Sequence, residues 1–64
     1  MINVVKTNTY ISNGIDEYYV VDVDHAYGRV LVQKCKSNIH DEKLPKRWID
    51  LEDVEDQFDE LAPA

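Results

Sequence analysis

The segment VVDVDHAYGRVLVQ, residues 20–33, constrains the fold of this chain most, because it holds two apolar runs of strand-forming residues around a short polar break. Tyr and Val at a spacing of two are typical of a strand over 17–23, and the same spacing returns over 30–35. The break ends at Gly28, and glycine readily takes the left-handed conformation that closes a hairpin loop. The segment therefore predicts a β-hairpin. We expect Tyr19, Val21 and Val23 on one face of its first strand and Tyr18, Val20 and Asp22 on the other, with a core built on Val21, Val23, Val30 and Val32.

Shorter elements flank the hairpin. Residues 2–11 (INVVKTNTYI) predict a first strand, and residues 12–14 (SNG) predict a turn, because Asn and Gly tolerate positive φ. Residues 36–45 predict a polar loop that ends at a proline, and residues 46–49 (KRWI) predict a further short strand. A lone two-stranded ribbon could not bury the apolar groups on both hairpin faces. We therefore expect the sheet to curl over one face and a helix or a bound partner to cover the other.

The period of the apolar residues changes after residue 49. Leu51, Val54, Phe58 and Leu61 recur at helical spacing, which predicts a helix over 51–61 that docks on the hairpin, inside an acidic amphipathic segment over 50–62. Asp50 suits the N-cap position. Like-charged carboxylates four residues apart weaken so short a helix. A second arrangement therefore stays open, with one helical turn over 51–56 (LEDVED) and a last strand over 57–61 (QFDEL).

The order of these elements resembles that of SH3-like small barrels of the Tudor and KOW type. The resemblance rests on the glycine-closed hairpin YYVVDVDHAYGRVLVQ and on RWIDLEDVE, and it covers residues 14–58. It implies a binding module for proteins, modified peptides or nucleic acid. We predict a single domain over 1–64 that is mainly β with a short C-terminal helix. Its β-rich part, residues 1–49, would be either a small SH3-like barrel or a strongly curled antiparallel sheet.

The formal net charge of −6 is unevenly distributed. Residues 1–49 hold all seven basic residues against six acidic ones, whereas residues 50–64 hold seven acidic residues and no basic one. Six of the basic residues lie between positions 29 and 47 against two carboxylates. A cationic middle is thus followed by an anionic end, and that end disfavours simple binding to phosphates.

The residue types that carry chemistry follow no catalytic or metal-binding pattern. The single cysteine, Cys35, can form no internal disulfide, and no stretch has the length or hydropathy of a signal peptide or membrane span, so we expect a cytoplasmic protein. His25, Cys35 and His40 match no zinc spacing, and two glycines cannot form a phosphate-cradling loop. We expect neither an enzyme nor a metal or cofactor site.

Two functions are compatible with this pattern. The first is a regulatory protein-binding module, comparable by analogy to the accessory proteins of phages and plasmids, which occludes a basic surface on a partner protein. Its expected contact residues are Tyr27, Trp48, Asp53, Glu55, Asp56, Asp59 and Glu60. The alternative is a nucleic-acid-binding barrel that uses Arg29, Lys34, Lys36, Lys46 and Arg47. A homodimer through paired edges of the hairpin is open in either case.

Overall fold

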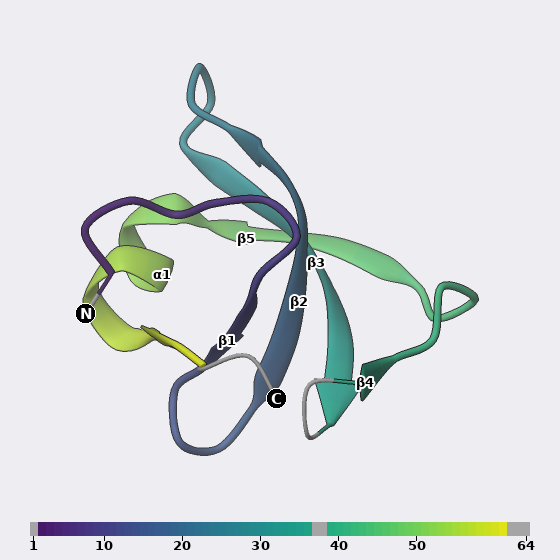
Figure 1. The fold of residues 1–64 in the computed structure, drawn as a ribbon. Helices are drawn as coiled ribbons and strands as arrows, with labels where there is room; N and C mark the ends of the chain where they lie inside the picture. The colour runs from purple at the N-terminus through teal and green to yellow at the C-terminus, as the bar shows by residue number, and fades with distance from the viewer. Residues whose placement is uncertain (1, 37–38, 62–64) are drawn as a thin grey trace.

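A computed structural model describes residues 2–36 and 39–61 of the chain. Over these residues the chain is mainly β with one short helix near the C-terminus, which confirms the predicted fold class (Figure 1). In chain order the elements are β1 (Tyr10–Ser12), β2 (Glu17–Asp24), β3 (Arg29–Lys36), β4 (Ile39–His40), β5 (Lys46–Asp50), α1 (Leu51–Gln57) and β6 (Asp59–Glu60).

All strand pairs are antiparallel, and β3 is the centre of the sheet. The strand order is β4-β3-β2-β1-β6. Strand β5 also pairs with β3: β5 pairs with residues 29–33 of β3, and β4 pairs with residues 35–36. The helix α1 follows β5 directly and returns the chain so that β6 pairs with β1. Figure 1 shows β2 and β3 as long, strongly bent strands. The first and last strands therefore meet on the side of the sheet away from β5.

The predicted hairpin is confirmed as β2 and β3, but a bulge at Val21 changes which side chains reach the core. The pairing is regular from Tyr18 to Val20 and then shifts between Val20 and Asp22. A bulged strand places an extra residue in the ladder and reverses the alternation beyond it. Val20, which precedes the shift, is 0% exposed, and Val21 in the bulge is only half-buried and lies outside the core cluster. Val23, beyond the bulge, packs against the core. The expected place of Val21 in the core is wrong, and Val20 takes it.

Residues 2–9 form no strand, although their composition predicts one. Asn8 has a φ of 60°, which interrupts an extended chain. Two backbone bonds still join this region to β2, from Asn8 N–H to Val20 O at 2.9 Å and from Val20 N–H to Thr9 O at 2.8 Å. The preceding residues turn away from the sheet, and Ile2 donates its N–H to the carbonyl of Glu55 in α1 at 3.0 Å.

The C-terminal segment follows the second of its two predicted arrangements. The helix ends at Gln57 rather than at residue 61, and Phe58 is extended with φ −108° and ψ 151°. Strand β6 then pairs Glu60 with Ile11 of β1. The edge of β1 supplies backbone partners for residues 59–61, and the strand avoids the repulsion between carboxylates four residues apart that a longer helix would carry. Asp50 occupies the N-cap position as predicted, but its side chain makes no capping bond.

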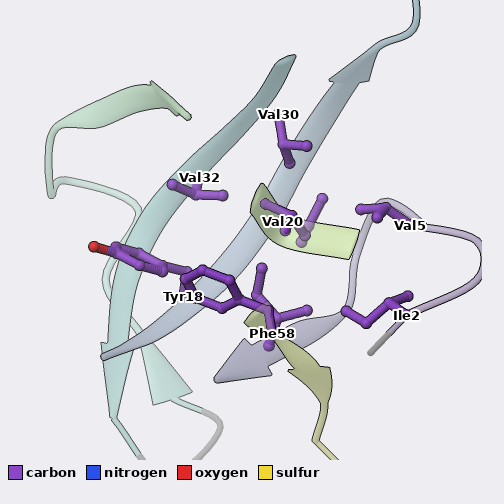
Figure 2. Close-up of a cluster of buried hydrophobic side chains, with 9 residues drawn as sticks. Ile2, Val5, Tyr18, Val20, Val30, Val32 and Phe58 are labelled. Atoms are coloured by element: carbon purple, nitrogen blue, oxygen red, sulfur yellow. The ribbon is translucent and has the colours of Figure 1, made fainter. Parts of the chain in front are cut away.

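One cluster of apolar side chains forms the core between the sheet, α1 and the N-terminal segment (Figure 2). Val54 and Phe58 are buried, so the apolar stripe of the tail docks as expected. The Phe58 ring packs against the Tyr18 ring with 5.8 Å between centroids. The buried members are Ile2, Val5, Ile11, Tyr18, Val20, Val30, Val32, Val54 and Phe58.

The two predicted turns around β2 form as their sequences indicate. Gly14 and Gly28 both have positive φ, 92° and 66°. The Asn13 side chain accepts the N–H groups of Ile15 and Asp16 at 2.9 and 2.7 Å. The predicted polar loop over 36–45 contains the short strand β4, and its residues 37–38 lie outside the described part of the chain.

Candidate binding surface

An exposed cluster of three stacked side chains, Tyr27, Arg29 and Trp48, lies on the outer face of the sheet. The guanidinium carbon of Arg29 is 4.3 Å from the centroid of the Trp48 ring and 5.1 Å from that of Tyr27. Tyr27 is 79% exposed and Trp48 is 41% exposed. We call these three residues the aromatic cluster. It presents large, nearly planar groups to solvent in a defined arrangement.

The hairpin loop holds the aromatic cluster in place. One carboxylate oxygen of Asp24 accepts the N–H groups of Ala26 and Tyr27, each at 3.1 Å, and the other lies 3.5 Å from Nε of Arg29. The carbonyl of Gly28 accepts the N–H of Leu51 at 2.8 Å, which ties the loop to the start of α1. A short loop with this many bonds has a pre-ordered backbone, which lowers the entropy that the loop loses on binding.

Carboxylates surround the aromatic cluster. One row across β2, β3 and β5 consists of Asp22, Leu31 and Trp48. A second row, two residues along β3 on the same face, consists of Asp24, Arg29 and Asp50. The first turn of α1, which follows Asp50 directly, adds two more acidic residues. We call this group the acidic end of the sheet. Its members are Asp22, Asp24, Asp50, Glu52 and Asp53.

The structure divides the acidic residues that the sequence predicted as one contact surface. Asp53 and Asp56 are exposed on α1, whereas Glu55 is half-buried and bonds through its carbonyl to the N-terminal segment. Asp59 and Glu60 are exposed on β6, at the edge that pairs with β1. The expectation of one acidic helix face is wrong for these two residues, because the helix ends before them.

The basic residues are also divided. Lys34, Lys36, Lys46 and Arg47 lie at the end of the β3–β5 pair farthest from the aromatic cluster. They are divided between the two faces of the sheet, because Lys46 pairs with Gln33 whereas Arg47 pairs with Val32 in the next row. We call these four residues the basic end. Arg29 lies at the opposite end of β3, beside carboxylates. Lys34 has a carboxylate neighbour of its own, with Nζ 3.6 Å from Oδ1 of Asp16.

Gln33 has a structural role that its sequence position did not reveal. It is 2% exposed, and its Nε2 donates to the carbonyls of Glu42 and Leu44 at 3.2 and 2.9 Å. This side chain holds the 41–45 loop against the outer face. A hollow of about 360 Å³ lies beside it, lined by Asn8, Tyr19, Val21, Gln33, Glu42 and Lys46. The residues around this hollow come from separate segments of the sequence, so only knowledge of the strand register could have predicted it.

The reactive residue types singled out in the sequence are divided between the two ends of β3. Cys35 on β3 lies opposite His40 of β4, and His25 is exposed in the hairpin loop. Burial raises the pKa of the Cys35 thiol, and the charge of Glu17 raises it further. Over residues 2–36 and 39–61, no three His, Cys, Asp or Glu side chains converge in a way that would hold a metal ion.

In the same described ranges, no helix has the length and apolar character needed to cross a bilayer. Comparison of the chain with protein-family models, with curated proteins and with solved structures found no match.

Proposed function

We propose that this chain is a small protein-binding module, not an enzyme, and that the aromatic cluster is the centre of its contact surface. The observation that carries the proposal is the exposed stack of Tyr27, Arg29 and Trp48. Trp, Tyr and Arg are the residue types most enriched at the energetic centres of protein interfaces. Packing such groups against a partner removes a large apolar area from water.

The charges around the cluster favour a partner with a basic surface. The acidic end carries five carboxylates, and the guanidinium of Arg29 is already matched by Asp24. Carboxylates at the rim of an interface steer a cationic partner and speed its association, whereas the central aromatic contacts supply most of the affinity. The module would therefore act as a regulator or inhibitor that covers a basic surface of its partner. This is the kind of role that small accessory proteins of phages and plasmids perform.

We also propose that the fold is an SH3-like barrel. The order β6-β1-β2-β3-β5 and the single helical segment between β5 and β6 support this assignment. The resemblance implies a binding module, which is compatible with a contact surface at the hairpin loop.

Trp48 is the only tryptophan of the chain and therefore reports directly on the proposed surface. We expect a partner captured from native lysate to shift the Trp48 emission and to protect it from quenching by acrylamide. Tyr27→Ala should weaken capture at least about tenfold, as truncation at the centre of an interface does. The matched control is Ile15→Ala, an exposed apolar residue in the other turn, which should leave capture unchanged. Equal capture by both variants would remove the aromatic cluster from the mechanism.

The basic end supports a second candidate function, binding to nucleic acid. Four of the five predicted basic residues lie at this end of β3 and β5, but Lys46 lies on the opposite face of the sheet from Lys34 and Arg47. Their attraction for phosphates is opposed by neighbouring carboxylates and by the net charge of −6. We expect no mobility shift with single- or double-stranded DNA or RNA at low salt. A shift that weakens steeply with salt, and that is lost in the triple variant Lys34→Ala, Lys46→Ala, Arg47→Ala, would favour this function instead.

A further inference from the structure

Strand β5 has an edge that no described residue pairs with. Its five residues pair with β3 on one side only. Every side chain in β5 except Ile49 is exposed. An unpaired edge offers a row of backbone donors and acceptors to another strand.

One hydrogen bond fixes which backbone groups of β5 point toward this free edge. Leu51 N–H bonds to Gly28 O, so residues 51 and 28 form a bonded pair in the antiparallel ladder. Bonded and non-bonded pairs alternate in such a ladder. The next bonded pairs are therefore Ile49 with Val30 and Arg47 with Val32. The N–H and C=O groups of Lys46, Trp48 and Asp50 must then point away from β3.

We propose that two copies of this chain associate through their β5 edges, antiparallel and about a two-fold axis at Trp48. Trp48 then lies opposite Trp48 of the second copy, and Lys46 lies opposite Asp50. Each of the three outward-pointing residues donates one backbone hydrogen bond and accepts one. Lys46 of each copy faces Asp50 of the other, so the dimer has two pairs of opposite charges directly across the ladder. Such pairs are stabilising.

Other symmetric registers fit worse. An axis at Arg47 would bring together two arginines whose backbone groups point toward β3. An axis at Lys46 or at Asp50 would place like charges opposite each other and leave most of the strand unpaired, and like charges in that position are destabilising. The Trp48 register alone uses the whole edge and pairs every charge on the outer face with its opposite.

The pairing extends the proposed function without depending on it. A two-fold axis perpendicular to the sheet keeps the outer faces of both copies on the same side. The two aromatic clusters would then form one continuous surface, and a partner could contact both. The interface is only five residues long in each chain, so we expect weak association that requires concentrated protein.

Charge exchange tests this register. The molar mass of the parent protein should rise with concentration from 7.5 kDa toward twice that value in sedimentation equilibrium, at concentrations up to about 1 mM. Lys46→Glu alone and Asp50→Lys alone should each weaken association at least about tenfold, because each places two like-charged pairs across the axis. An equimolar mixture of the two variants should associate again, because both pairs are then of opposite sign.

Circular dichroism of dilute samples checks that both charge variants are folded. A parent chain that is monomeric at about 1 mM, or single variants that associate as tightly as the parent, would overturn the proposal. A folded mixture of the two variants that stays monomeric would overturn it as well.

A cross-link gives an independent test that does not rely on charge. Paired residues at a bonded position lie about 5.5 Å apart between Cα atoms, within the range that a disulfide spans. In a Cys35→Ser background, Trp48→Cys should form a covalent dimer under mild oxidation, whereas the exposed control Ile15→Cys should not. Equal cross-linking of the two variants would indicate random collision and contradict the register.

Discussion

A single inserted residue decides which valines of β2 support the fold. Val20 faces Val32 across the hairpin and is fully buried, whereas Val21 lies in the bulge on the opposite face. Beyond the bulge, Val23 packs against the core and Asp22 is exposed beside the aromatic cluster. The bulge therefore serves both faces of the sheet, because it keeps valine inward and aspartate outward after the strand bends.

Matched truncations measure this difference. Val20→Ala should lower the free energy of unfolding by about 2 kcal/mol, since it removes two buried methyl groups and leaves a cavity. Val21→Ala should cost less than about 1 kcal/mol, because that side chain is half-exposed. Urea unfolding followed by circular dichroism gives both values. A larger loss for Val21→Ala than for Val20→Ala would place the bulge elsewhere.

The hairpin was predictable from residues 20–33, but the bulge was not. The sequence VVDV fits either side of a strand equally well, so alternation alone could not show where the pairing shifts. The exposure of Tyr27 followed from its place in a polar loop. Its stacking on Arg29 depends on the rotamers that Asp24 and Trp48 allow, and these are set by tertiary packing.

The raised pKa of Cys35 predicts a slowly reacting thiol. The protonated form persists to higher pH than in a free cysteine, so alkylation by iodoacetamide near pH 8 should be slower than in the urea-unfolded chain. The unfolded state releases the thiol proton first as pH rises. Stability should therefore fall as pH passes above the ordinary range of a thiol, and Cys35→Ser should reduce that loss. Identical alkylation rates in the folded and unfolded chains would contradict the burial of Cys35.

At the scale of elements, α1 shows how strand pairing can end a helix. The helical spacing of Val54 and Phe58 holds in the structure, because both are buried, yet the chain becomes extended at Phe58. The sequence predicted the docked face but left the end of the helix open. The edge of β1, which receives β6, lies more than 40 residues away in the sequence, and local propensity does not report such a partner.

The uneven charges of α1 predict opposite effects for one substitution at two positions. Asp56→Lys should raise stability by about 0.5 kcal/mol, because the last turn has no basic residue and the introduced lysine would lie one turn after Glu52. Asp53→Lys should lower stability by a similar amount, because it places a positive charge in the first turn. Thermal melting at low salt measures both, and high salt should shrink both effects. Shifts of the melting temperature in the same direction for both variants would contradict an effect of the helix dipole on the stability of α1.

At the scale of the whole molecule, the chain separates opposite charges along one pair of strands. The β3–β5 register places the acidic end and the aromatic cluster at one extreme and the basic end at the other. The sequence showed the basic section and the acidic tail, but it could not show that Trp48 would lie next to Arg29. That neighbourhood is a side-chain contact between residues 19 positions apart, which depends on the β3–β5 register and is visible only in the folded chain.

The N-terminal segment packs on the core, and its first described residue, Ile2, reaches α1. Ile2 is buried in the cluster, and its N–H bonds to Glu55 O, whereas its neighbour Val4 is 63% exposed. Ile2→Ala should therefore lower the free energy of unfolding by about 2–4 kcal/mol, as core truncations do. Val4→Ala, the matched control, should change it by less than about 0.5 kcal/mol. Amide exchange locates the effect: Ile2→Ala should speed exchange in α1, including Phe58 N–H, which bonds to Val54 O. If α1 exchanges equally fast in both variants, the N-terminal segment does not hold the helix on the sheet, and β5 and β6 must position it alone.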